Sequence, residues 1–77
     1  MSITVAKTLD LTGLSCPLPI IKTAQALKAM ASGDVVEALA TDPGSVPDFA
    51  AWGRSTGNQL VEQTRHGEVY RFVIRKR

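Results

Sequence analysis

Residues 4–31, TVAKTLDLTGLSCPLPIIKTAQALKAMA, contain the change of hydrophobic period that decides the fold. Residues 4–11 follow a two-residue period, which predicts a β-strand. Beyond Cys16 the apolar residues recur at spacings of four, three and four, which predicts an amphipathic helix through Ile20, Ala24, Leu27 and Ala31. Pro17 suits the first helical position because an N–H there would have no partner, and Gly33 is a typical stop. We expect a strand, a short loop and a helix.

The next part of the chain predicts a second strand and a second helix. The run of residues 35–41 is short and apolar, with Gly33 before it and Pro43-Gly44 after it, which is typical of a buried strand. Ser45, with Asp48 three residues later, forms a variant of the capping box that starts helices. Gly57 is positioned to end this helix.

The C-terminal part predicts a β-hairpin. Residues 59–65 and 69–75 form two extended runs, and Gly67 between them can adopt a positive φ. In the last strand two sets of side chains point to opposite faces: Tyr70, Phe72 and Ile74 toward the helices, and Arg71, Val73 and Arg75 toward water. The expected fold is an α/β (α+β) two-layer sandwich of order β-α-β-α-β-β, with two helices on one face of a four-stranded mixed sheet.

Composition limits the classes of function. The chain has 77 residues, 44% of them hydrophobic and 21% charged, so we expect residues 1–77 to form a single domain. The formal net charge of +2 does not by itself imply binding to nucleic acid. With one cysteine and no long apolar run or secretory leader, the sequence indicates a protein of the reducing cytoplasm that does not contact membranes.

Cys16 is the residue whose position indicates chemistry. We expect it at the N-cap of the first helix, after a loop that contains Gly13 and before Pro17 and Pro19, which make the first turn rigid. A helix N-terminus offers partial positive charge and unpaired N–H groups, so the pKa of the thiol should fall below about 8.5. A lone cysteine is often only a small buried hydrophobic residue. Because Cys16 lies outside the apolar stripe, we interpret it as an exposed, reactive thiol.

Other kinds of catalytic site have weaker support. A metal centre needs several ligands at suitable spacing, and Cys16 with His66 does not make one. A Cys–His hydrolase would need His66 as its base, although a histidine in a hairpin turn is more often only a solvated residue. A dithiol oxidoreductase needs a resolving cysteine, which this chain lacks. We therefore expect neither a metal nor a cofactor.

The stretch from Thr8 to Pro19 resembles the signature of the TusA-like sulfur carrier family, whose hallmark is Cys-Pro-x-Pro at the start of the first helix. Further segments resemble that family in the same order and spacing: Asp42-Pro43, Val46-Pro47-Asp48-Phe49 and YRFVIRK at residues 70–76. The likeness extends over nearly the whole chain and implies the same sandwich. Many relatives have a second cysteine near the position of Gly53, and its absence here argues against roles that need two thiols.

The resemblance implies a stoichiometric sulfur-transfer protein rather than an enzyme, with Cys16 as the residue that accepts sulfur. Members of the family hold a sulfane sulfur as a persulfide, taken from a cysteine desulfurase or a rhodanese-type sulfurtransferase. They pass it to partner proteins for tRNA thiolation, molybdenum-cofactor assembly or sulfur oxidation, and the sequence leaves these roles open. We expect the helix N-terminus to stabilise the persulfide anion as it stabilises the thiolate.

Four residues are candidates for docking to partner proteins. Leu18 lies between the two prolines and is interpreted either as an exposed contact or as a cap over the helix start. Lys22, Arg71 and Arg75 would attract acidic partners, although such charges often only solvate a surface. Nothing in the pattern requires more than a monomer.

Two alternative functions stay open. A small RNA-binding domain would use the basic C-terminus, which contains Arg71, Arg75, Lys76 and Arg77. Phe49 and Trp52 are expected in the core rather than as a stacking platform for bases. A redox regulator would instead oxidise Cys16 to a sulfenic acid or a mixed disulfide.

Overall fold

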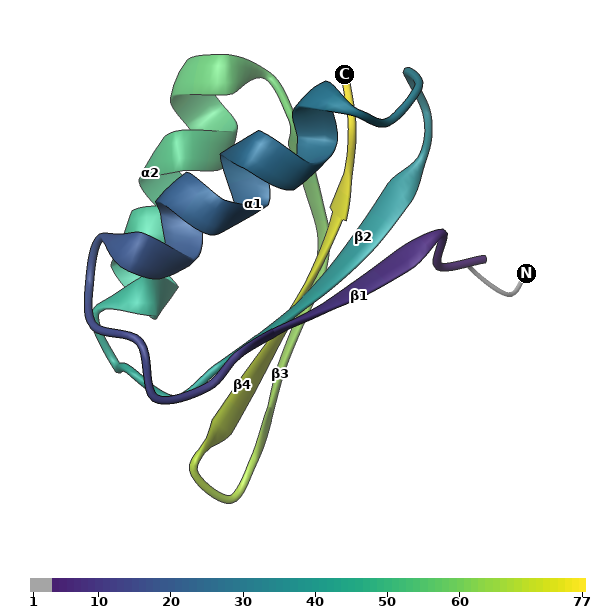
Figure 1. The fold of residues 1–77 in the computed structure, drawn as a ribbon. Coiled ribbons are helices and arrows are strands. Elements are labelled where there is room, and N and C mark those ends of the chain that lie inside the picture. The colour runs from purple at the N-terminus through teal and green to yellow at the C-terminus, as the bar shows by residue number, and fades with distance from the viewer. Residues whose placement is uncertain (1–3) are drawn as a thin grey trace.

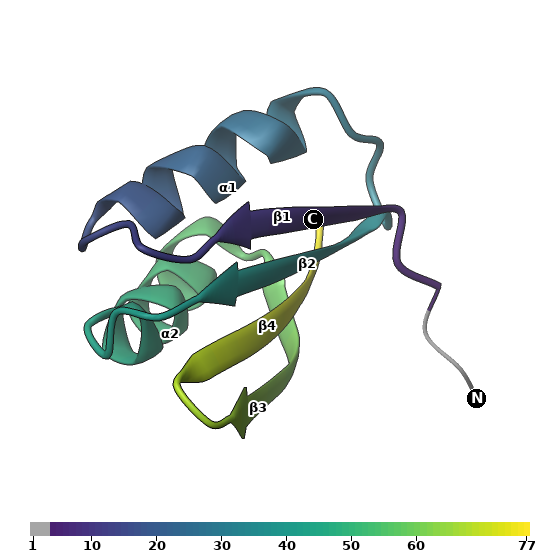
Figure 2. The same ribbon diagram turned by 60° about the horizontal axis from the view of Figure 1, so that its bottom comes forward.

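The structure, a computed structural model, describes residues 4–77. Its helices and strands follow in the order β1 (Lys7–Leu11), α1 (Leu18–Lys28), β2 (Val35–Ala40), α2 (Ser45–Thr56), β3 (Gln59–His66) and β4 (Val69–Arg75). The strands form one sheet of order β1-β2-β4-β3, in which only β1 and β2 are parallel neighbours. Both helices lie on one face of it (Figures 1 and 2). The predicted two-layer sandwich is confirmed.

Neither helix in this described part is long and apolar enough to span a membrane.

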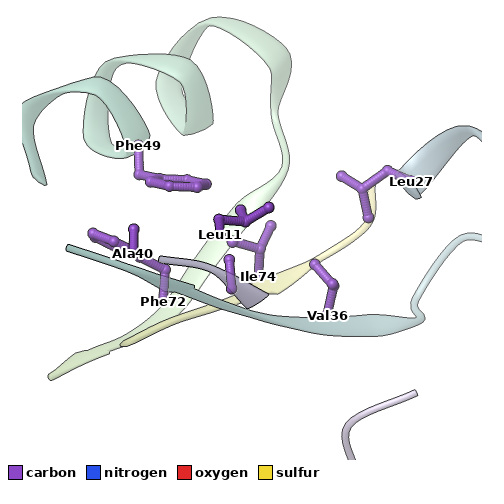
Figure 3. Close-up of a cluster of buried hydrophobic side chains, with 8 residues drawn as sticks. Leu11, Leu27, Val36, Ala40, Phe49, Phe72 and Ile74 are labelled. Carbon is purple, nitrogen blue, oxygen red and sulfur yellow. The ribbon is translucent and has the colours of Figure 1, made fainter. Parts of the chain in front are cut away.

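The core lies between the sheet and the two helices. Eight buried side chains form it (Figure 3): Leu11, Leu27, Val36, Ala38, Ala40, Phe49, Phe72 and Ile74. Phe49 of α2 stacks on Phe72 of β4 with ring centroids 4.3 Å apart, and Trp52 meets Phe49 edge-on at 5.9 Å. These contacts confirm the core positions expected for the aromatic residues, and they hold the first turns of α2 against the sheet.

The start of β1 and the end of α1 differ from the predicted boundaries. The first strand begins at Lys7 rather than at Thr4, although the Ala6 N–H still donates to the Val35 carbonyl of β2 at 2.8 Å. Helix α1 ends at Lys28, before the predicted stop at Gly33. The reason is a cap from another part of the chain, because Lys76 Nζ donates to the carbonyls of Leu27 at 2.6 Å and Met30 at 2.5 Å.

The start of α2 also differs from the prediction. Gly44 is its N-cap, Ser45 is already helical, and no side chain caps the helix, so the predicted capping box is not formed. The Ser45 hydroxyl is buried without a hydrogen-bond partner, and Asp48 contacts a different residue, described below. The end of the helix at Gly57 is confirmed, since Gly57 has a φ of 80° and its N–H donates to the Gly53 carbonyl at 2.9 Å.

The face of the sheet away from the helices carries a row of polar side chains across all its strands. Thr8 Oγ1 donates to Glu37 at 2.9 Å, and Arg71 forms ion pairs with Glu37 and, at 3.4 Å, with Glu62. Val73, which we expected to face water here, is fully buried. It lies in register between Glu37 of β2 and Glu62 of β3, the two carboxylates that Arg71 bridges. Arg71 is thus paired within the sheet.

The Arg71–Glu37 pair predicts an acid-sensitive component of stability. The hydrogen bond from Arg71, followed by that from Thr8, lowers the pKa of Glu37 from its ordinary value of 4.5. A carboxylate with a lower pKa in the folded chain stabilises the fold above the unfolded pKa, and this stabilisation is lost as the pH falls through the folded pKa. Glu37→Gln should therefore lower the free energy of unfolding near neutral pH by about 0.5–1 kcal/mol, as expected for a partly exposed pair, and by less in acid.

Urea unfolding of both proteins at neutral and acidic pH measures this difference. Glu68→Gln, which removes an exposed carboxylate from the hairpin turn, is the matched control and should change stability little at either pH. An equal loss at both pH values for Glu37→Gln would show that the ion pair is not the source.

Candidate functional site

The topology brings two loops to one edge of the sheet. Because β1 and β2 are parallel neighbours, their carboxyl ends meet there, and each leads through a loop into a helix. Residues 12–17 contain Cys16 and precede α1, and residues 41–44 precede α2; the two loops lie side by side (Figures 1 and 2). The Gly13 N–H donates to Thr41 Oγ1 at 2.9 Å, and the Cys16 N–H donates to Asp42 Oδ2 at 2.5 Å.

Asp42 holds the backbone around Cys16 in place. Besides accepting the Cys16 N–H through Oδ2, it accepts the Gly44 N–H through Oδ1 at 3.2 Å, and its carbonyl accepts the Ser45 N–H at 2.9 Å. Gly44 in turn lies close to the cysteine, since a Cβ added to it would stand 3.3 Å from Cys16 Cβ. The side of Cys16 that faces Gly44 is therefore already filled by backbone.

The Cys16 thiol is exposed, as predicted, but its electrostatic surroundings are the opposite of those predicted. Its Sγ donates a hydrogen bond to Asp48 Oδ2, in the first turn of α2. This hydrogen bond, followed by desolvation and by the negative charges of Asp48 and Asp42, raises the pKa of Cys16. The predicted lowering of the pKa is wrong: these contacts favour the neutral thiol over the thiolate.

The start of α1 explains why the helix does not lower this pKa. The helix begins at Leu18 with Pro17 as its N-cap, so Cys16 lies one residue before the N-cap and not, as we predicted, at it. Pro17 and Pro19 have no N–H to offer, and the Leu18 N–H donates to the Ser15 carbonyl at 2.8 Å. The Cys16 N–H is occupied by Asp42. The unpaired backbone N–H groups that we expected around the sulfur are thus largely absent.

The residues predicted to support the motif have separate structural roles. Gly13 adopts a φ of 82° in the turn after β1, a conformation that favours glycine. Pro19 is buried beneath the first turn of α1, where its carbonyl accepts a hydrogen bond from Thr23 Oγ1 at 2.8 Å. Pro17 is exposed beside the cysteine. Together these residues fix the path of the chain before and after Cys16.

The candidate docking residues fall into two separate groups. Leu18 is 42% exposed in the first turn of α1, and Ile21, which sequence reasoning missed, is 43% exposed one turn later. Lys22 is exposed next to Ile21. Arg71 lies instead on the far face of the sheet in its ion pairs, and Arg75 lies at the opposite end of β4, where Nη1 donates to Gln59 Oε1 at 3.4 Å. Only the α1 group neighbours Cys16.

Gly53 marks the position near which many relatives have a second cysteine. A Cβ added to it would stand 3.1 Å from the carbonyl oxygen of Asn58, in the connection between α2 and β3. This glycine therefore packs closely against that connection. A side chain here requires the backbone of the connection to shift.

Asp48 is the functional residue whose role sequence reasoning missed. It was expected to cap its own helix, whereas it contacts a thiol that lies 32 residues earlier in the chain. His66, the one histidine, is exposed at the end of β3 and is not the partner of the sulfur. The site therefore combines a thiol with two carboxylates, Asp42 on its backbone and Asp48 on its sulfur.

Comparison with known proteins gives consistent matches over almost the whole chain. The family model described as Sulfurtransferase TusA matches residues 7–76. The sulfur carrier protein TusA of Allochromatium vinosum is 50% identical over 68 residues, which cover 88% of this chain and 90% of that protein. YrkI of Bacillus subtilis is 44% identical over 91% of this chain and 93% of its own length. The crystal structure of the SirA-like protein from Desulfitobacterium hafniense has a TM-score of 0.78 at 27% identity, covering 90% and 95% of the two chains.

Proposed function

The chain belongs to the TusA family of sulfur carriers, and on this basis we propose that it carries one sulfane sulfur atom as a persulfide on Cys16. The observation that supports this most directly is the exposed thiol at the edge of the sheet, the only thiol in the chain. Its backbone is fixed by Asp42, so the sulfur has a defined position from which to meet a partner. The protein acts stoichiometrically and returns to its empty state after each transfer.

Loading needs no external oxidant or reductant. The Cys16 thiol loses its proton, and its sulfur attacks the outer sulfur of a donor persulfide, so that a new S–S bond forms as the donor's S–S bond breaks. The electron pair of the broken bond stays on the donor sulfur, which takes up a proton and becomes a thiol. Unloading is the same exchange with the acceptor's thiolate as nucleophile and Cys16 as leaving group. One cysteine is sufficient for both steps.

The proposed partners are proteins that hold a persulfide or a reactive thiol of their own. A cysteine desulfurase or a rhodanese-type sulfurtransferase would supply the sulfur, and an acceptor protein would remove it. Leu18 and Ile21 form an exposed apolar patch beside Cys16, and we place the contact with both partners there. Because Cys16 must remain a free thiol between cycles and not form a disulfide, the reducing cytoplasm is the compartment that suits this role.

The geometry supports neither alternative function. An RNA-binding surface would need the basic C-terminus free, but Arg71 is paired with Glu37 and Glu62 and Lys76 caps the end of α1. A redox regulator would need an oxidant, whereas exchange of sulfur with a donor persulfide needs none.

A loading assay tests the proposed function. The protein is incubated with a cysteine desulfurase and free cysteine, and its intact mass is read before and after reduction. We expect a gain of one sulfur atom, its loss on treatment with a reductant, and no gain when Cys16 has first been alkylated. An unchanged mass, or a gain that persists after alkylation of the single thiol, would contradict the proposal.

A further inference from the structure

Asp48 is the side chain in direct contact with the Cys16 sulfur, and no step of the transfer described above uses it. Resting on the proposed function, we propose that Asp48 weakens the hold of the carrier on its outer sulfur: at equilibrium it favours the empty state, because its carboxylate accepts a hydrogen bond from the neutral thiol and repels the persulfide anion. The empty carrier holds a neutral thiol that donates a hydrogen bond to Asp48. The loaded carrier holds a persulfide anion, which has no proton to donate and is repelled by the carboxylate.

The position of Asp48 is fixed by the fold. It lies in the first turn of α2, next to the N-terminus of the helix. The next residue, Phe49, is fully buried and stacks on Phe72 of the sheet, so the backbone of this turn has little freedom to move away from the cysteine.

The charges that act on Cys16 all have the same sign. Within residues 4–77 the pKa of this thiol responds to two charged groups, Asp48 on the sulfur and Asp42 on the backbone N–H, and both raise it. At the end of β1, Asp10 is hydrogen-bonded to Thr12. On α1, Lys22 is exposed in the second turn. A persulfide anion at this site therefore meets the same repulsion as a thiolate.

The space around the cysteine sets the direction in which the loaded side chain extends. Backbone at Gly44 fills one side, since even a Cβ there would stand only 3.3 Å from Cys16 Cβ, and Asp48 repels the anion from α2. The outer sulfur therefore extends toward solvent, where an acceptor thiolate can reach it. When that thiolate takes the outer sulfur, Cys16 receives the electron pair of the broken S–S bond, binds a proton from water and donates it in a hydrogen bond to Asp48.

The partition of sulfur between the carrier and a small thiol tests this inference. Wild-type protein and Asp48→Asn are equilibrated with a fixed ratio of glutathione persulfide to glutathione, and intact mass gives the ratio of loaded to empty carrier. We expect this ratio to be about fivefold higher in Asp48→Asn, the factor produced in water by two like charges about 4 Å apart. The pH profile of alkylation by iodoacetamide should also move to lower pH in the variant.

Glu68→Gln, which removes one negative charge from the distant hairpin turn, should leave both measurements unchanged. Equal loaded ratios and superimposable alkylation profiles for wild type and Asp48→Asn would overturn the inference. If neither protein accepts sulfur, the proposed function fails, while the alkylation profiles still test the effect of Asp48 on the thiol. If Asp48→Asn does not fold, wild-type protein in increasing salt replaces it, because screening should move its profile to lower pH and a salt-independent profile would overturn the inference.

Discussion

Replacing Cys16 with serine should abolish sulfur loading completely while leaving the fold intact. The side chain is exposed and takes no part in the core, so its replacement removes no packed surface. A serine hydroxyl can still donate to Asp48, which preserves the contact between the loop before α1 and the first turn of α2. The oxygen is not a thiol and forms no persulfide. Intact mass after incubation with a desulfurase and free cysteine measures loading, and urea unfolding measures stability.

A relocated thiol is the matched control for this variant. Ser15 is exposed immediately before Cys16, so Ser15→Cys combined with Cys16→Ser keeps one accessible thiol and moves it by one residue. It also moves the thiol away from its position next to Pro17. We expect loading to be about 100-fold slower, the cost of a small misplacement of a reacting group. If the relocated thiol is loaded at the wild-type rate, only the accessibility of a thiol matters, and the position of Cys16 in the fold has no effect on loading.

The second large effect is expected on stability, from Phe49→Ala. Phe49 is fully buried between the stacked ring of Phe72 and the edge-on ring of Trp52. Truncation of a buried phenylalanine typically costs about 3–5 kcal/mol. At about 0.05–0.15 kcal/mol per residue, a domain of 77 residues has a free energy of unfolding of roughly 4–12 kcal/mol, so this loss removes a large part of it. The variant should be largely unfolded or should unfold at far lower urea concentration than the wild type.

Phe49→Leu separates the loss of packing from the loss of the aromatic ring. It retains most of the apolar volume and should cost roughly 1 kcal/mol, so the variant stays folded. Since Phe49 follows Asp48 directly, Phe49→Leu also shows whether the carboxylate is still held against the sulfur, by its alkylation profile with pH. A loss below about 1 kcal/mol for Phe49→Ala itself would contradict the central place of this ring in the core.

The order of the elements could be predicted because it depends on local periodicity, whereas their ends depend on distant contacts. The alternation in β4 places Phe72 and Ile74 in the core as expected. The end of α1 could not be predicted, because its last carbonyls are capped by Lys76, which lies 49 residues from Leu27. The burial of Val73 could likewise not be predicted from alternation alone, because its neighbours Glu37 and Glu62 come from two other strands.

At the site, the sequence predicts the reactive residue but not its protonation state. A cysteine beside a helix start predicts a lowered pKa from local structure alone. In the fold, the parallel pairing of β1 and β2 brings Asp42 and Asp48 to the cysteine, and a hydrogen-bonded carboxylate outweighs a helix start whose prolines have no N–H. The direction of the pKa shift of Cys16 therefore depends on tertiary contacts. Its main cause is Asp48, which the local pattern assigned to the cap of its own helix.

The central claim is that Cys16 both accepts sulfur and gives it up to another protein or thiol. A chase with radioactive sulfur tests it most directly: the carrier is loaded by a desulfurase from labelled cysteine, separated from the donor, and then mixed with an acceptor thiol. The account predicts that the label moves to the acceptor and that the carrier returns to its unloaded mass, ready to be loaded again. Label that stays on the carrier, or that Cys16→Ser acquires equally, would contradict it.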